Sequence, residues 1–192
     1  MMPPNAPISA RERTRLLPSL TSRGQLEQIE RLSINGARVW VMRAAVLKRE
    51  DLLTEAFARE LHRRMFMGIW RDAGRYRTTK RNPGWEPKRI AEGVRLILDD
   101  AEAWFRFGTY PVHEAAVRLH QRLVSLHPWS NGNGRHARLM ADVVVASHGE
   151  APLTWGSRGE AGAPGSARPR YLEAMRRADA GNFGPLLEFA GG

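Results

Sequence analysis

The stretch from residue 127 to residue 138 reads His-Pro-Trp-Ser-Asn-Gly-Asn-Gly-Arg-His-Ala-Arg. A plain interhelical turn accounts for the Asn-Gly pairs, but not for a histidine before the turn and two arginines after it. The glycines let the backbone fold tightly, so that successive N–H groups can point into one concavity. A helix that begins here adds its unpaired N–H groups and the positive end of its dipole. The stretch therefore predicts an anion-binding turn at the start of a helix.

Charged side chains flank this turn on both sides. Arg135 and Arg138 are three residues apart on one face of the expected helix, so both can reach phosphate oxygens. His127 follows the apolar seam of the preceding helix, where a lone histidine is commonly structural. Beside a bound polyphosphate, a neutral imidazole can instead take the proton of an incoming hydroxyl as a general base. The residues alone leave both interpretations of His127 open.

Helical periodicity dominates the rest of the chain, and long alternating strands are absent. The pattern therefore predicts an all-α protein. We expect Thr109 to cap the helix that begins at Pro111, a favoured first-turn residue. The expected helices cover about residues 26–40, 51–70, 88–105, 111–126, from within 131–135 to 148, 168–180 and 183–189.

The remaining segments connect these helices within one domain. Residues 74–87 are rich in Arg, Thr, Gly and Pro, and we expect an exposed hairpin or loop there. Residues 149–167 are dense in Gly, Ala, Pro and Ser, which predicts a long mobile loop. Nothing in the sequence indicates an interdomain linker. We expect a flexible basic tail over residues 1–14 and a single domain over residues 15–192.

Composition limits the class of function. The 192 residues include 30 Lys or Arg and 20 Asp or Glu, which gives a formal net charge of +10. This charge suits a polyanionic partner such as nucleic acid, an anionic membrane surface or a polyphosphate ligand. The absence of cysteine excludes disulfides, thiolate nucleophiles and cysteine metal sites. No apolar run approaches the roughly 20 residues of a membrane span, and no secretory signal is evident, so we expect a cytoplasmic protein.

Residues 127–138 resemble the signature of the Fic family, His-Pro-Phe-x-Asp/Glu-Gly-Asn-Gly-Arg-x-x-Arg. Residues 74–79, Gly-Arg-Tyr-Arg-Thr-Thr, are similar to the segment known in that family as the flap. Three further stretches resemble a Fic subfamily called mobile mystery protein B: Thr21–Trp40, Leu61–Phe66 and Pro152–Gly156. The resemblance covers about residues 15–190. It implies a compact bundle of helices with a short β-hairpin flap at about residues 74–87.

The resemblance also implies an activity and assigns roles to residues. It implies a bacterial protein adenylyltransferase that moves AMP from ATP to a Ser, Thr or Tyr hydroxyl of a target protein, with Mg²⁺ or Mn²⁺, and releases pyrophosphate. His127 is then the general base, Arg135 holds the β-phosphate and Arg138 the γ-phosphate. The residues that cradle the α- and β-phosphates are Gly132, Asn133 and Gly134. The flap residues that dock the target peptide through an open strand edge are Arg77, Thr78 and Thr79.

The sequence departs from the family pattern at the metal position. Asn131 stands where the family carries an acidic residue that binds Mg²⁺, and an amide oxygen attracts this hard cation less than a carboxylate does. The change indicates weakened turnover, an altered nucleotide or cofactor, or no consequence, and we favour retained but weak activity. Trp129 replaces the usual Phe at a position that the resemblance makes a buried aromatic anchor. We favour a core role for Tyr171 over stacking on adenine.

The inhibitory motif of the family, Ser/Thr-x-x-x-Glu-Gly/Asn, has no intact copy here. Glu27 and Glu30 are weak candidates for its glutamate, and we favour ordinary solvated helix carboxylates for both. A separate antitoxin-like inhibitor protein is therefore expected.

Three other functions remain open. The first is a catalytically weak Fic-like module of the toxin–antitoxin type that binds nucleotide or a partner protein, and the second is transfer of another phosphate-containing group such as UMP. Nucleic-acid binding ranks last, because no convincing helix-turn-helix or aromatic-basic strand face is present.

Overall fold

A computed structural model describes residues 6–82, 84–156 and 167–191. These residues form a bundle of helices and contain no extended sheet, only isolated β-bridges, so the predicted all-α class is confirmed. In chain order the helices are α1 (Ala10–Arg13), α2 (Arg23–Val41), α3 (Ala44–Leu47), α4 (Glu55–Phe66), the 3₁₀ turn η1 (Pro87–Arg89), α5 (Ile90–Phe107), α6 (Val112–Leu126), α7 (Asn133–Ser147), α8 (Ala167–Asp179) and α9 (Gly184–Ala190).

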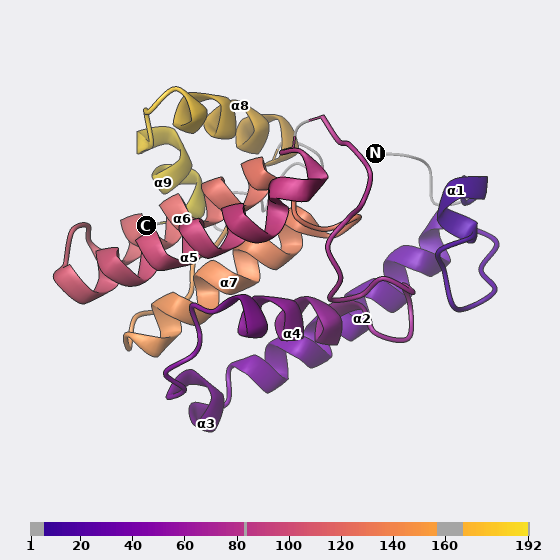
Figure 1. The fold of residues 1–192 in the computed structure, drawn as a ribbon, viewed down its shortest axis with the longest axis horizontal. Coiled ribbons are helices and arrows are strands. Elements are labelled where there is room, and N and C mark those ends of the chain that lie inside the picture. The colour runs from indigo at the N-terminus through magenta and orange to yellow at the C-terminus, as the bar shows by residue number, and fades with distance from the viewer. Residues whose placement is uncertain (1–5, 83, 157–166, 192) are drawn as a thin grey trace.

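The pair α6 and α7 forms the centre of the bundle (Figure 1). In Figure 1, α2 and α4 lie together on one side of this pair, and α8 and α9 lie together on the other. Every residue of α7 from Ala137 to Val145 is buried except Arg138, because the helix is surrounded by neighbours. Burying a large aliphatic side chain contributes about 1.5–3 kcal/mol, so this packing fixes the N-terminus of α7 firmly in place.

The long helices fall where periodicity predicts them, and their ends differ for local reasons. Helix α4 begins at Glu55 because the Thr54 hydroxyl accepts a hydrogen bond from the Phe57 N–H at 3.2 Å. Helix α6 begins at Val112 behind Pro111, and no side chain caps it, so the predicted cap at Thr109 is wrong. The one-turn elements α1, α3 and η1 were not predicted, because four residues or fewer carry no periodicity.

The predicted β-hairpin over residues 74–87 is not formed. The described part of this flap is an irregular segment with one antiparallel bridge, between Tyr76 and Trp129. Next to the bridge, the Arg77 N–H donates to the Pro128 carbonyl at 3.0 Å. The flap therefore pairs with the turn before α7 instead of with a second strand of its own.

Two predicted mobile segments lie partly outside the described residues. Residues 6–14, expected as part of a flexible tail, include helix α1 with its Ser9 capping box, and the Ile8 side chain is 2% exposed. This part of the chain therefore packs on the domain. Residues 1–5 and residues 157–166, which make up much of the predicted mobile loop, are not described. No helix in the described ranges is long and apolar enough to cross a membrane.

Candidate active site

The turn at the start of α7 has the backbone that the sequence predicts. Gly132 is the N-cap residue with φ +71°, and a Cβ atom there would lie 2.3 Å from the Phe66 ring. Asn133 closes the turn, because its side chain accepts from the Trp129 N–H at 2.8 Å and donates to the Trp129 carbonyl at 2.9 Å. Gly134 has open space where a side chain would stand. An anion can therefore approach the backbone closely at Gly134.

The first N–H groups of α7 are available to a ligand. The His136 N–H donates to the Gly132 carbonyl, and within the described structure the N–H groups of residues 133–135 have no acceptor. These donors and the positive end of the helix dipole face a cavity of about 690 Å³. All five residues predicted to hold phosphates line this cavity: Gly132, Asn133, Gly134, Arg135 and Arg138. Its volume lies in the range of small-molecule sites.

The other walls of the cavity come from elements that the signature does not contain. Helix α2 supplies Arg23 and Glu30, and helix α8 supplies Tyr171. Trp155 lies between them and is anchored by Asp142, whose carboxylate accepts from the Trp155 indole N–H at 2.8 Å and from Arg38 at 2.9 Å. Tyr171 therefore lines the cavity, which the sequence interpretation as a core tyrosine did not anticipate.

Arg138 is poised for an anion. Its guanidinium carbon lies 4.6 Å from the centre of the Tyr171 ring and 5.7 Å from the centre of the Trp155 ring. It forms no ion pair with any described carboxylate, and its Nε is buried without a hydrogen-bond partner. A buried donor without an acceptor is costly, and a ligand oxygen would satisfy it.

Arg135 differs, because it already has a carboxylate partner. Its guanidinium is 2.8 Å from Glu30, which also accepts from the Trp70 indole N–H at 2.7 Å. Glu30 is 5% exposed, which corrects the expectation of a solvated carboxylate, whereas Glu27 is exposed at the rim. The reason is that Glu30 lies on the inner face of α2, four residues after the buried Leu26. A phosphate at Arg135 must share or replace this ion pair.

His127 is the C-cap residue of α6 and adopts a left-handed backbone with φ 55°. Such a conformation costs free energy for a residue other than glycine, so its surroundings must hold it. Burial of the half-buried imidazole lowers its pKa below 6.5, and the nearby charges of Arg77 and Arg81 lower it further. His127 is therefore neutral at pH 7, the form that a general base requires. It does not line the 690 Å³ cavity.

Arg77 forms a hydrogen bond that helps to fix the backbone of His127. Its side chain is 2% exposed and donates to the carbonyls of His127 at 2.5 Å, Thr79 at 2.7 Å and Trp85 at 2.5 Å. This placement corrects the expectation that Arg77 contacts a target protein, because its donors are engaged inside the molecule. Thr78 and Thr79 are exposed, as a docking segment requires.

Two buried histidines form hydrogen bonds with residues of the turn. His62 on α4 accepts from the Gly74 N–H through Nδ1 at 2.9 Å, so its Nε2 donates to the Asn131 carbonyl at 3.3 Å. Burial lowers the pKa of His62 well below 6.5. The Trp129 indole N–H donates to Nδ1 of His136 at 3.2 Å, and burial lowers the pKa of His136 to about 4. Trp129 is 1% exposed, as expected of an aromatic anchor.

The metal position offers one neutral oxygen. Both polar side-chain atoms of Asn131 are buried without a hydrogen-bond partner, so its Oδ1 is free to accept a cation or a proton donor. No group of three His, Asp or Glu side chains suited to a metal ion occurs in residues 6–82, 84–156 and 167–191. Asn131 does not itself line the 690 Å³ cavity, but it adjoins Gly132, which does. A Mg²⁺ that arrives with a triphosphate would therefore take most of its oxygen ligands from the nucleotide.

A model of the Fic/DOC family matches residues 52–145, which include α4, α5, α6, most of α7 and the complete anion-binding turn. The chain therefore contains a Fic domain over these residues, and the predicted resemblance to the Fic family is confirmed. It is 25% identical over 168 residues to a protein adenylyltransferase Fic of Culex quinquefasciatus, a match that covers 85% of this chain and 32% of that protein. It is 28% identical over 135 residues to protein adenylyltransferase fic-1 of Caenorhabditis elegans, covering 68% and 25%. The chain thus spans about a third or less of the length of these relatives.

Solved structures agree on the fold. A Fic-domain signalling protein of Bacteroides thetaiotaomicron has a TM-score of 0.67 at 21% identity, over 83% of this chain and 66% of that chain. Fic-1 of C. elegans has a TM-score of 0.66 at 25% identity, over 93% of this chain and 51% of that chain. The predicted Fic-type helical fold is confirmed.

Proposed function

We propose that this chain is a protein adenylyltransferase that transfers AMP from ATP to a hydroxyl side chain of a target protein. The observation that carries the proposal is the convergence of four features on one turn. The free N–H groups of α7 and the unpaired Arg138 face a nucleotide-sized cavity. A neutral His127 ends the helix before the same turn, and the flap, with its exposed Thr78 and Thr79, pairs with that turn at Trp129.

The chemistry follows from these positions. The triphosphate binds at the N-terminus of α7, with Arg138 and Arg135 on its outer phosphates. His127 takes the proton from the target hydroxyl, and the hydroxyl oxygen forms a bond to the α-phosphorus. The bond between the α-phosphorus and the oxygen that bridges to the β-phosphate breaks, and pyrophosphate leaves with that electron pair. Catalysis of this kind depends on positioning and on neutralising charge, which the turn and the arginines supply.

Mg²⁺ fits this scheme as a companion of the nucleotide. Asn131 Oδ1 is the protein oxygen that we assign to it, and the cation would neutralise charge on the phosphates. Replacing Asn131 by Asp adds a charged ligand. If metal binding limits the rate, Asn131→Asp raises the transfer rate.

A weak, nucleotide-binding module is the second candidate, and one contact favours it. The ion pair between Arg135 and Glu30 occupies one of the two phosphate arginines, and Asn131 lacks a charge. Transfer of another phosphate-containing group such as UMP remains a prediction to be tested with the same assay. The antitoxin-like partner, the cytoplasmic location and membership of the mobile mystery protein B subfamily also stay predictions.

The test is transfer of label from ATP labelled at the α-phosphate. Purified protein is incubated with the labelled ATP, Mg²⁺ or Mn²⁺ and a bacterial lysate, beside the variants His127→Ala and Asn131→Asp. Label on a protein band that is lost in His127→Ala supports the proposal. The same incubation with labelled UTP tests the alternative donor.

Binding of ATP is measured separately by calorimetry. If the parent protein binds ATP but neither it nor the variants transfer AMP, the result favours the nucleotide-binding module. Absence of ATP binding contradicts the assignment of the phosphate site.

A further inference from the structure

A second arginine, Arg81, stands beside His127. The Cβ atoms of Arg81 and His127 lie 3.3 Å and 3.1 Å from the position that a Cβ atom on Gly84 would take, so the two residues are close neighbours. Arg81 is partly exposed, in contrast to the buried Arg77. Its charge is close enough to lower the pKa of His127, and its partial exposure leaves it accessible to a molecule that binds beside this histidine.

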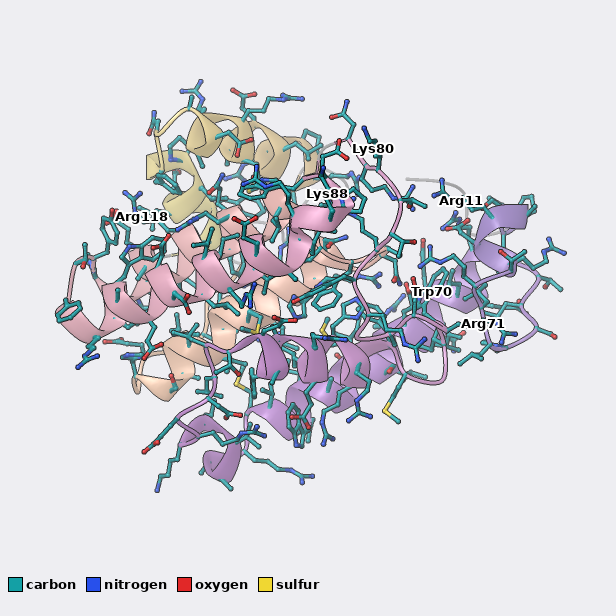
Figure 2. All side chains as sticks on the ribbon, in the orientation of Figure 1. Arg11, Trp70, Arg71, Lys80, Lys88 and Arg118 are labelled. Atoms are coloured by element: carbon teal, nitrogen blue, oxygen red, sulfur yellow. The ribbon has the colours of Figure 1, made fainter. Side chains whose placement is uncertain are left out.

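Arg11 adds a second positive charge at the outer edge of the flap. It belongs to helix α1, more than sixty residues away in sequence, and its Nη2 donates to the Thr79 hydroxyl at 3.4 Å. Thr79 and Arg81 are two residues apart, and two residues of chain span at most about 7 Å, so the two positions are neighbours on the flap. In Figure 2, Arg11, Arg71 and Lys88 lie in the same part of the view as the flap residue Lys80, whereas Arg118 lies at the opposite end of the molecule.

Neither Arg11 nor Arg81 is neutralised by the part of the chain that the structure describes. Nearby cations are paired: Arg15 with Asp72 at 2.5 Å, Arg23 with Glu12 at 2.5 Å and Lys80 with Glu86 at 2.9 Å. The pKa of Arg81 is lowered by partial burial and by the charges of Arg11 and Arg15. Like charges gathered without a counter-ion favour the approach of an anionic partner.

The nucleotide does not account for these two charges. The cavity that holds the phosphate residues is lined by neither Arg11 nor Arg81, and His127 lies outside it as well. The phosphate site therefore does not use these charges, and Arg81 adjoins His127, the residue that receives the target hydroxyl in the proposed function.

We propose that Arg11 and Arg81 select target proteins whose modified hydroxyl is flanked by acidic side chains. This inference rests on the proposed function and specifies its substrate class. Arg81 binds a carboxylate next to the hydroxyl, because it adjoins His127. Arg11 binds a second carboxylate about two residues further along a target segment that lies against Thr78 and Thr79. Guanidinium groups suit this role, since they bind carboxylates with two parallel hydrogen bonds.

Binding of labelled peptides tests the proposal without ATP. Three fluorescent 12-residue peptides carry one central Ser and differ only in the flanking residues, which are Glu, Gln or Lys. Fluorescence anisotropy with the full chain should show the Glu peptide binding at least tenfold more tightly than the Gln peptide, and the Lys peptide more weakly still. The double variant Arg11→Glu/Arg81→Glu should lose this preference.

The control for charge reversal is Arg106→Glu, which makes half the change of charge of the double variant, and the same change as Arg11→Glu or Arg81→Glu alone, at an exposed position near the far end of α5. Sixteen residues of helix separate it from Ile90, a distance of about 24 Å. It should keep the preference for the Glu peptide. Circular dichroism and the melting temperature of each variant show whether the fold is retained.

Three results overturn the proposal. The first is equal affinity for the Glu and Gln peptides, and the second is an equal loss of the preference for the Glu peptide in the control variant. The third is displacement of the Glu peptide by a 12-base-pair DNA duplex when the phosphate concentration of the duplex equals the carboxylate concentration of the peptide. The last result identifies a nucleic-acid surface instead. Failure of AMP transfer is measured separately, because preference for the Glu peptide without any transfer contradicts only the proposed function.

Discussion

Replacing Gly132 and Gly134 by alanine separates the folding role of the signature turn from its binding role. The Gly132→Ala variant should lose stability, because Gly132 has φ +71° and the added methyl carbon would lie 2.3 Å from the Phe66 ring. The left-handed backbone costs an alanine about 1–2 kcal/mol, and displacing a packed ring costs about 1–3 kcal/mol more. The expected loss of about 2–5 kcal/mol is a large part of the stability of an ordinary domain.

Gly134→Ala is expected to behave in the opposite way. Gly134 lies in the first turn of α7, and nothing stands within 4 Å of an added methyl group. Alanine is the better helix former by up to about 1 kcal/mol, so the folded state should be as stable or slightly more stable. The methyl group nevertheless occupies the space where a phosphate meets the backbone. ATP affinity should therefore fall at least tenfold.

Urea unfolding followed by tryptophan fluorescence measures the first quantity, and isothermal calorimetry with ATP measures the second. The two variants should separate: Gly132→Ala loses stability, and Gly134→Ala loses affinity alone. Equal stability of both variants would refute the steric argument at Gly132. Unchanged ATP affinity in Gly134→Ala would refute the close approach of phosphate to the backbone.

Three other perturbations test further contacts. Arg77→Lys should lower the free energy of unfolding, measured with urea, by at least about 2 kcal/mol and should also lower the transfer rate, because a lysine cannot reach the carbonyls of His127, Thr79 and Trp85 together. An unchanged urea midpoint would contradict this argument. Glu30→Gln keeps an acceptor for Trp70 but removes the charge beside Arg135, so calorimetry should show ATP affinity rising about tenfold, and a fall would contradict the competition. Burial lowers the pKa of His120 to about 3 and that of His136 to about 4, so the unfolded chain binds more protons than the folded chain below pH 6.5. The free energy of unfolding should therefore fall from pH 6.5 to pH 4 by up to about 1.4 kcal/mol per pH unit for each histidine. A free energy of unfolding that does not change over this pH range would count against the burial of these histidines.

The sequence predicts the turn better than it predicts the elements that surround it. The phosphate residues from Gly132 to Arg138 gather as expected, because a contiguous motif carries its own geometry. The positions of Glu30 and Tyr171 in the cavity wall were not predicted, because they depend on which helices pack across the cavity. Helical periodicity in the sequence does not indicate which helices pack together. Glu30 has one local signal, since it shares the helix face of the buried Leu26.

The flap shows a second limit of the sequence. Its composition predicts a hairpin, yet the segment bonds to the turn at Trp129 and Pro128 instead. Arg77 is the residue whose side chain makes this possible, and an arginine in a basic loop gives no sign that it will be buried. Short elements such as α1 and α3 are missed for another reason, because four residues carry no helical periodicity.

The two faces of the turn before α7 have a kinetic consequence for the proposed reaction. The phosphate residues line the cavity between α2 and α8, whereas His127 and the flap lie outside it. Donor nucleotide and target protein then reach the turn from different sides, and neither has to leave before the other arrives. Such an enzyme forms a ternary complex and no AMP-bound intermediate of its own. Double-reciprocal plots of rate against ATP, at several target concentrations, should therefore intersect instead of running parallel.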